Sequence, residues 1–297
     1  MKKLYAILIV IMFSNDFFAQ HSTLTSNYLL NIFSINPAYA GQRRSLDMTL
    51  FYRKQWLGAS GTPQTASILG SMEIKPKNLS VGFHYDNDNI GFTNTSAIKI
   101  ALSYRLKLDK TRKLAFGIMP GYRKMFYDYR KLRTTTQGDG TFDVNTPTIN
   151  SFISSAGAFY YSKKMYLGVS SPELLNLNGN NPSVELNFIA GYIFNLSSNV
   201  VLKPSVLVRE IKNSPTQIDI NLTTYFNEDL GIGLAYRNKD ALVAYFDWVI
   251  DKDKKFKVGY AYDYSIGTIR KYNSGSHEIM LNYFFGKLSY APSPRFF

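Results

Sequence analysis

The feature of this sequence that most constrains its fold is an alternation of apolar and polar residues that runs from Ser45 nearly to the C-terminus. In the segment 97–108, AIKIALSYRLKL, every second residue is isoleucine, leucine or tyrosine, and the residues between them are small or charged. The segment 217–226, QIDINLTTYF, repeats the pattern. A period of two residues is typical of β-strands with one apolar and one polar face. The chain is therefore predicted to be all-β.

The predicted strands are too long for an ordinary soluble sheet. There are about fourteen of them, and most span nine to sixteen residues. Strands of soluble proteins average about 5–6 residues, whereas a tilted strand that crosses a bilayer needs about 9–11. The pattern therefore favours an antiparallel transmembrane β-barrel of the outer-membrane type over the alternative, a secreted β-sandwich. The predicted strands cover residues 45–54, 64–72, 79–87, 95–108, 112–127, 149–161, 163–170, 184–196, 199–210, 216–227, 229–237, 241–249, 254–264 and 276–286.

The connections between these strands alternate in length. Those after even-numbered strands are short, such as KPKN at 75–78 and SSN at 197–199. Outer-membrane barrels have an even strand number, short periplasmic turns and longer extracellular loops, so both ends of the barrel sequence are expected in the periplasm. The short link at 238–240 departs from this alternation. The longer connections, after odd-numbered strands, are predicted at 55–63, 88–94, 128–148, 171–183 and 265–275.

The N-terminus has the features of an export signal. Lys2 and Lys3 precede an apolar run of about ten residues, which is half of the roughly 20 that a membrane-spanning helix needs. A cleavage site is expected after Ala19. The sequence therefore predicts a protein of the outer membrane, with a signal peptide at 1–19, a periplasmic N-terminal segment at 20–44 and the barrel at 45–297.

Composition restricts the possible partners and chemistry. The chain has no cysteine, which excludes disulfides and thiolate metal sites. The net charge is +13, but lysine and arginine are scattered rather than clustered, so no nucleic-acid partner is expected. Aromatic residues make up 15% of the chain, and many lie near strand ends, where barrels carry interfacial girdles. Four basic residues occupy strand positions that are predicted to face the inside of the barrel: Lys99, Arg105, Lys203 and Arg209. They either line a path for anions or pair with acidic residues and close the lumen.

No catalytic constellation can be assembled from the sequence. The chain has three histidines, and no GxSxG or HExxH motif accompanies them. Two acidic patches, DNDN at 86–89 and GDGTFD at 138–143, contain the oxygen ligands that Ca²⁺ accepts. Turn formation by their Asx and Gly residues is the favoured explanation of both patches. No catalytic residue, metal or cofactor is predicted.

Four motifs occur in order along the mature chain: INPAYAG at 35–41, YRKQWLGASGTPQT at 52–65, AYDYSIGTIRKYNSGSHEIML at 261–281 and SPRFF at 293–297. As a set they resemble the PorP/SprF family, outer-membrane proteins of the type IX secretion and gliding systems of Bacteroidota. The resemblance covers essentially the whole mature chain. The candidates that it gives for family-motif or partner contacts are Asn36, Pro37, Tyr39, Gly41, Tyr52, Arg53, Gln55, Trp56, Pro63, Tyr262, Tyr264, His277, Glu278 and Phe297.

Turn chemistry explains the INPAYAG motif. Asn36 can bond its own backbone, Pro37 fixes φ at about −65°, and Gly41 tolerates a positive φ. A turn that leads the segment 20–44 into the first strand is therefore favoured over a docking role. In the family, the motif marks where the N-terminal segment enters the barrel. Trp56 is either an interface anchor or a partner contact.

The resemblance implies a non-enzymatic role in the export or surface attachment of cargo, often a large adhesin. It implies partners in the type IX secretion and gliding machinery at the periplasmic face, where the segment 20–44 and the lysine-rich short turns are expected, with outer-membrane lipid around the barrel. The terminal Phe297 then resembles an aromatic signal for barrel insertion, or it belongs to a frayed tail. Two other functions stay open, a channel or transporter for small solutes and a barrel enzyme.

Overall fold

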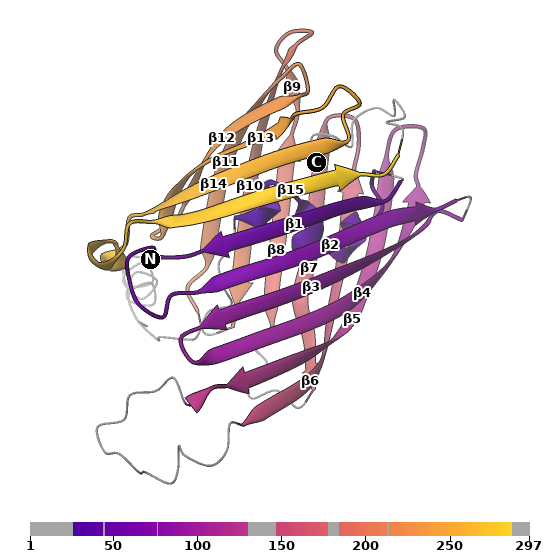
Figure 1. Ribbon diagram of the computed structural model, residues 1–297. Helices are drawn as coiled ribbons and strands as arrows, with labels where there is room; N and C mark the ends of the chain where they lie inside the picture. The colour runs from indigo at the N-terminus through magenta and orange to yellow at the C-terminus, as the bar shows by residue number, and fades with distance from the viewer. Residues whose placement is uncertain are drawn as a thin grey trace, which may run out of the picture.

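The computed structural model describes residues 26–43, 45–75, 77–129, 147–177, 184–212 and 214–286. Their strands form one antiparallel sheet that closes on itself, so the alternating segments give the predicted barrel (Figure 1). The strands are β1 (Asp47–Lys54), β2 (Gln64–Ile74), β3 (Leu79–Ile90), β4 (Thr93–Lys107), β5 (Lys113–Tyr127), β6 (Thr148–Tyr161), β7 (Met165–Leu177), β8 (Glu185–Tyr192), β9 (Phe194–Asn195), β10 (Val200–Ile211), β11 (Gln217–Phe226), β12 (Leu230–Arg237), β13 (Ala241–Val249), β14 (Phe256–Ser265) and β15 (Ser276–Phe284).

The barrel wall consists of fourteen strands. β8 and β9 pair with the same neighbour, β10, on either side of Ile193, so together they are one interrupted strand. The sheet closes where β1 pairs with β15 and where β10 pairs with β11. The predicted strand number and antiparallel topology are therefore confirmed.

Two connections differ from the sequence prediction. The loop expected at 88–94 is a turn of only two residues, Gly91 and Phe92, because β3 continues to Ile90 and β4 begins at Thr93. Gly91 takes φ +58°, which suits a tight hairpin turn. The DNDN patch therefore lies within β3 and not in a turn, and Asp88 there accepts a hydrogen bond from Thr65 of β2 at 2.6 Å.

β7 also extends beyond its predicted end, and it does so through an irregularity. The register between β6 and β7 shifts between Ser154 and Ala156, and the Ser155 hydroxyl donates to the Pro172 carbonyl at 2.5 Å. A bulge is where a strand accommodates proline, which lacks a backbone donor. β7 thus continues to Leu177, past the predicted end at residue 170.

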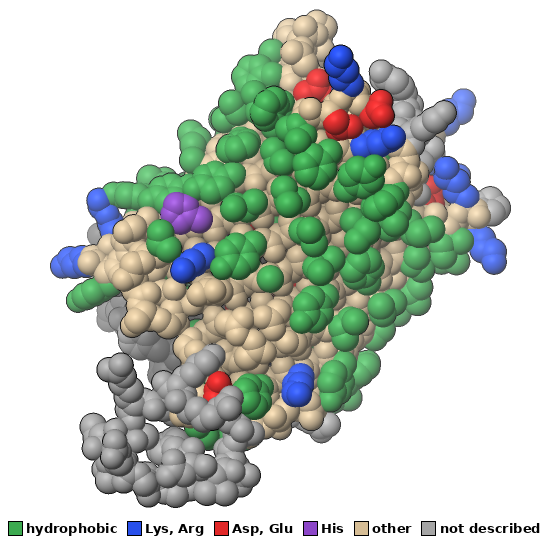
Figure 2. Space-filling view, in the orientation of Figure 1, with side chains coloured by type: hydrophobic (Ala, Val, Ile, Leu, Met, Phe, Trp, Pro, Cys, Tyr) green, Lys and Arg blue, Asp and Glu red, His purple; other side chains and the backbone are tan. Residues whose placement is uncertain are grey.

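The outward face of the wall is apolar, as the alternation predicts. Figure 2 shows hydrophobic side chains spread over the visible wall of the barrel. Leu234 is 67% exposed, Ile220 59% and Ile98 54%, which is unfavourable in water but matches a hydrocarbon environment. The closed sheet leaves no unpaired strand edge, which is a requirement for backbone inside a bilayer.

No helix among the described residues is long and apolar enough to cross a membrane. The described helices are short 3₁₀ turns: η1 (Asn27–Leu29), η2 (Ile32–Ser34), η3 (Pro37–Tyr39) and η5 (Thr268–Tyr272).

The two ends of the barrel differ. We call the end with the turns after β2, β4, β6, β9, β11 and β13 the short-turn end, and the opposite end the long-loop end. The start of β1 and the end of β15 lie at the short-turn end, which faces the periplasm by the general rule for these barrels. In the tight turn after β4, backbone donors of Thr111 and Arg112 hold the pKa of Asp109 below its usual range.

The segment expected at the periplasmic face lies instead inside the barrel over its described residues, 26–43. We call residues 26–43 the lumen segment. Figure 1 shows its short helices behind β1 and β15. Its apolar residues are buried except for the partly buried Leu29, with Tyr28 and Phe33 each 2% exposed and Ala38 0%. They pack with inward-facing residues of the wall in one buried cluster. The hydrophobic core of this protein therefore fills the interior of the barrel. The predicted periplasmic location of the segment 20–44 is therefore wrong for residues 26–43, because their apolar side chains are buried against the inner face of the wall.

Candidate functional site in the barrel lumen

The lumen segment runs from one mouth of the barrel to the other. At the long-loop end, Ser26 donates its hydroxyl to Asp263 at 2.9 Å. At the short-turn end, Arg43 donates to Asn282 at 3.0 Å and lies 3.4 Å from the carboxylate of Asp47, the first residue of β1. The segment therefore crosses the full height of the lumen before the chain enters the wall.

The INPAYAG motif fixes the middle of this segment to the wall. Asn36 is fully buried and caps η3, because its side-chain oxygen accepts from the Ala38 backbone N–H at 3.0 Å. Its Nδ2 donates to the carbonyl of Ala158 on β6 at 3.1 Å and to that of Val169 on β7 at 3.4 Å. Pro37 starts the helix, where a missing backbone donor costs nothing. One side chain thus caps the turn and binds two strands.

The wall beneath the motif is a glycine socket formed by Gly117, Gly157 and Gly168 on β5, β6 and β7. A Cβ at Gly117 would lie 2.4 Å from the backbone nitrogen of Ala38, and one at Gly157 would lie 2.3 Å from Oδ1 of Asn36. Contacts that short are impossible without movement of the motif. Gly117 and Gly157 are direct cross-strand partners, and Gly168 lies two positions along, opposite Phe159 of β6, so three neighbouring strands lack a side chain around the motif.

Gly41 ends the motif in a position that only glycine suits. Its φ is +68°, and a Cβ there would lie 2.3 Å from the Ser80 hydroxyl. Its N–H donates to Ser71 at 3.1 Å, and its carbonyl accepts from Arg105 at 2.9 Å. Tyr39 is 7% exposed and packs edge-on against Phe159, with the ring centroids 5.4 Å apart. The motif therefore forms the predicted turn and also packs against the wall of its own barrel.

A buried ionic cluster anchors the other end of the lumen segment. We call Arg53, Arg237, Asp219, Asp263 and Glu278 the arginine–carboxylate cluster. Arg53 lies 2.8 Å from Asp263 and 3.0 Å from Glu278. Arg237 lies 3.1 Å from both Asp219 and Asp263. Every member is at most 3% exposed, so each charge depends on its partners.

The lumen segment supplies neutral donors to this cluster. The backbone N–H of Ser26 donates to Glu278 at 3.2 Å, and the Tyr28 hydroxyl donates to Asp219 at 2.7 Å. The side chain of Arg237 also donates to the Ser26 hydroxyl at 3.2 Å. Removal of the segment would leave these carboxylates short of donors, so the segment and the cluster stabilise each other.

Three of the four inward cations found by sequence are paired with carboxylates. Lys99 lies 3.5 Å from Asp86. Arg105 lies 2.9 Å from Glu73, and Arg209 lies 3.2 Å from Glu185. Of the two predicted arrangements, an anion path and a closed lumen, these pairs correspond to the closed lumen. Lys203 differs and is considered below.

The structure divides the predicted motif residues between the two faces of the wall. Asn36, Pro37, Tyr39, Gly41, Arg53, Gln55 and Glu278 are buried in the lumen, and Tyr52, Tyr262, Tyr264 and His277 lie on the outward parity. Trp56 and Pro63 bound the first loop, where Gln55 N–H donates to the Pro63 carbonyl at 2.9 Å. The outward His277 bonds the Tyr260 hydroxyl at 2.6 Å through Nδ1. Phe297 and the GDGTFD patch lie outside the described residues.

Sequence reasoning missed the glycine socket and the two partners Asp219 and Arg237. The alternation in the sequence places the three glycines on the inward face of their strands. Nothing in the sequence indicated that a second segment of the chain would pack against them. Within the described ranges, no group of three or more His, Cys, Asp or Glu could hold a metal ion.

The barrel resembles solved outer-membrane transporters in fold. The P. putida toluene transporter TodX matches with a TM-score of 0.52 and 8% identity, over 86% of this chain and 94% of that one. The monoaromatic hydrocarbon channel CymD matches with a TM-score of 0.51 and 9% identity, over 92% of this chain and 96% of that one. At such low identity the likeness concerns the fold alone.

The sequence itself matches a family. No curated protein matches it significantly. The family model described as type IX secretion system membrane protein PorP/SprF matches residues 17–283, which is nearly the whole chain and runs from before the lumen segment into the last strand, β15. With its apolar-walled barrel of the outer-membrane type, the chain belongs to the PorP/SprF family of type IX secretion system membrane proteins and is a protein of the outer membrane.

Proposed function

We propose that this protein is a non-enzymatic component of the type IX secretion and gliding system that supports the export or surface attachment of a cargo protein such as a large adhesin. It acts by contact at its two faces and conducts nothing through its lumen. The observation that carries this proposal is the lumen segment, which crosses the barrel from mouth to mouth and is bonded to the wall at both ends and in the middle.

The occupied lumen is the reason to prefer a contact role over the channel. A conducting barrel needs a continuous polar path, but here buried residues of the segment fill the interior together with inward residues such as Phe159 and Met119. Liposomes that contain the pure protein should therefore take up small sugars no faster than empty liposomes. Rapid uptake by the wild-type protein would favour the channel.

The short-turn end supports binding to an acidic partner in the machinery. Several exposed lysines in its turns have no carboxylate within 4.0 Å among the residues that the structure describes. They are Lys75, Lys77, Lys110, Lys163, Lys164 and Lys252. Such a surface attracts an acidic protein with an affinity that falls as salt rises. Because the lumen segment is inside the barrel, these turns, and not residues 26–43, form the proposed periplasmic contact surface.

The proposed function is tested by deletion and complementation. Deletion should remove a cargo protein from the cell surface, as seen by comparing the surface and medium proteomes with those of the parent. The wild-type gene should restore the cargo, and so should Lys271→Gln, which changes an exposed lysine at the long-loop end. The double variant Lys163→Gln, Lys164→Gln should restore it less well and should retain less of the secretion machinery on affinity purification. Unchanged surface proteins in the deletion strain would overturn the proposal.

A further inference from the structure

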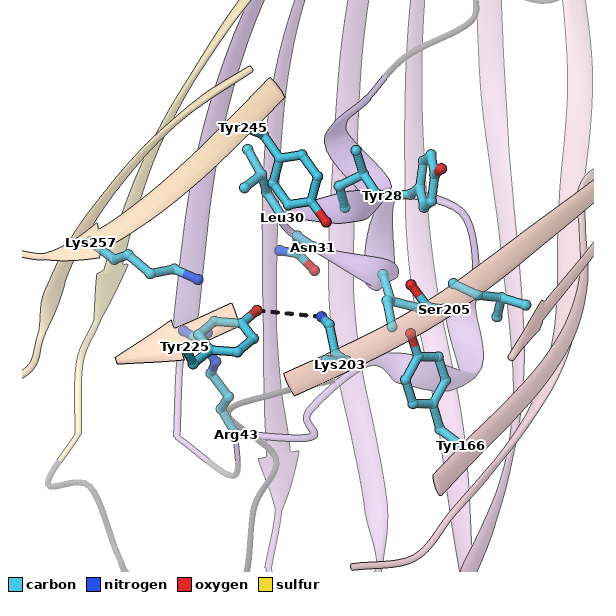
Figure 3. A pocket seen from close by; sticks show the side chains of 13 residues that line it. Tyr28, Leu30, Asn31, Arg43, Tyr166, Lys203, Ser205, Tyr225, Tyr245 and Lys257 are labelled. Atoms are coloured by element: carbon cyan, nitrogen blue, oxygen red, sulfur yellow. Dashed lines mark hydrogen bonds between the residues drawn. The ribbon is translucent and has the colours of Figure 1, made fainter. Parts of the chain in front are cut away.

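A small cavity lies between the lumen segment and the wall near the short-turn end. Its volume is about 20 Å³. Figure 3 shows the polar ends of Lys203, Tyr225 and Lys257 around it, with Arg43 of the lumen segment on the same side. The hydroxyls of Tyr166 and Ser205 also line it. The cavity is therefore surrounded mainly by hydrogen-bond donors, although it lies inside a largely apolar core.

Lys203 is the cation at this cavity that has no carboxylate partner in an ion pair, although its Nζ lies over the ring of Tyr225, 5.4 Å from the centroid. It is 6% exposed, and its Nζ bonds the Tyr225 hydroxyl at 3.3 Å. Among the described residues no carboxylate lies within 4.0 Å of this ammonium group, whereas the other three inward cations predicted from sequence each have one. Tyr225 is neutral, so it satisfies one donor but not the charge. A buried ammonium group without a counter-charge is costly, and a bound anion would supply that counter-charge.

The charges around the cavity leave one positive charge in excess. Lys257 lies 3.3 Å from Asp247, and Arg43 lies 3.4 Å from Asp47. Asp247 also acts electrostatically on Lys203, but these two carboxylates balance only two of the three cations, Lys203, Lys257 and Arg43. A single monovalent anion would make the cluster neutral, whereas a divalent one would reverse its sign.

The size of the cavity limits the ligand further. A volume of about 10–15 Å³ is enough for one water molecule, so a cavity of about 20 Å³ admits a single species little larger than water. A halide ion fits this description, and an organic acid or a phosphate does not.

We propose that the cavity is a binding site for one small monovalent anion of the halide class, held by the ammonium group of Lys203 within the donor-lined cavity. Such an anion would join the lumen segment to the wall, since Arg43 and residues 28–32 line one side and β10, β11 and β14 the other. The site does not depend on the proposed role in secretion, because it follows from the charges and the volume of the lumen alone.

The direct test is crystallography of the full-length mature protein in sodium bromide, because bromide scatters anomalously and is close to chloride in size. The expected result is an anomalous difference peak within hydrogen-bond distance of Lys203 Nζ. The peak should be lost in Lys203→Met, which removes the ammonium group but keeps an unbranched side chain only one atom shorter, and should persist in Lys107→Met, which changes an exposed lysine at the end of β4. No peak in the wild-type protein, or a peak that survives Lys203→Met, would overturn the proposal.

A solution measurement covers the case in which a variant crystallises poorly. The wild-type barrel in detergent should unfold a few degrees higher in sodium chloride than in sodium gluconate of equal ionic strength, because gluconate is too large for the cavity. Lys203→Met should lose this difference, and Lys107→Met should keep it. Equal unfolding temperatures of the wild-type protein in the two salts would count against the site.

Discussion

At the scale of single residues, the fit between the INPAYAG motif and the glycine socket decides whether the lumen segment stays in place. Asn36 holds three backbone groups at once, and two of them belong to different strands of the wall. No other side chain of similar size combines an acceptor for the helix N–H with donors for two carbonyls. The socket completes the fit because its glycines let the motif backbone approach the wall.

Gly157→Val should therefore expel the motif. The new Cβ would collide with the Asn36 side chain, and overpacking of this kind lowers the free energy of unfolding by about 1–3 kcal/mol. The measurement is the temperature at which the protein changes its mobility on a detergent gel, together with solute uptake by liposomes, which should rise. Ala158→Val is the matched control, since Ala158 is the next residue on β6 and lies on the outward parity. Equal behaviour of the two variants would show that the motif does not need the socket.

Asn36→Ala tests the same contact from the side of the segment. Loss of the cap and of two donors to the wall should lower the free energy of unfolding by about 1–3 kcal/mol. Denaturant unfolding followed by tryptophan fluorescence measures the change. Asn238→Ala, at a half-buried position in the turn between β12 and β13, should have little effect. A cost for Asn36→Ala no greater than that for Asn238→Ala would contradict the assigned role.

At the scale of elements, the sequence predicted the wall well and the lumen poorly, for a physical reason. Alternation is a local signal imposed by lipid outside and a packed interior within, so strands such as β4 and β11 could be placed almost to the residue. What fills a barrel is decided by contacts between residues far apart in sequence, such as Ser26 with Asp263 and Tyr28 with Asp219. No period marks those contacts. The short hairpin at Gly91 was missed because its Asx-rich flanks resemble a loop.

The arginine–carboxylate cluster should be the most sensitive element of the lumen. Arg53→Met would leave Asp263 and Glu278 with too little positive charge, and breaking a buried pair of this kind costs about 3–5 kcal/mol. The variant is expected to unfold at a markedly lower denaturant concentration. Arg112→Met is the control, because Arg112 pairs with Asp109 in an exposed turn, where ion pairs contribute little. A similar loss in both variants would mean that burial does not matter to the cluster.

At the scale of the whole molecule, the lumen segment changes where the chain is expected to meet its surroundings. The wall begins and ends at the short-turn end, but Ser26 lies at the long-loop end because the segment first crosses the lumen. The protein therefore presents two different surfaces. The lysine-rich turns face the periplasm, and the longer loops and the entrance of the lumen segment face the cell exterior.

This arrangement predicts the side of the membrane on which the residues before Ser26 are reached. A chain spans at most about 3.6 Å per residue, so four residues reach no farther than roughly 15 Å, whereas the hydrocarbon core is about 30 Å thick. Because the chain has no cysteine, single cysteines can be introduced without background. Ser22→Cys should react with a membrane-impermeant maleimide on intact cells, as should Tyr272→Cys in η5, where the tyrosine is 74% exposed. Lys110→Cys, in a short turn, should react only after the outer membrane is opened.

Two results would contradict this arrangement. If Tyr272→Cys is labelled on intact cells but Ser22→Cys is protected, the segment does not cross the lumen in the cell. If Lys110→Cys is labelled on intact cells and Tyr272→Cys is protected, the barrel has the opposite orientation in the membrane.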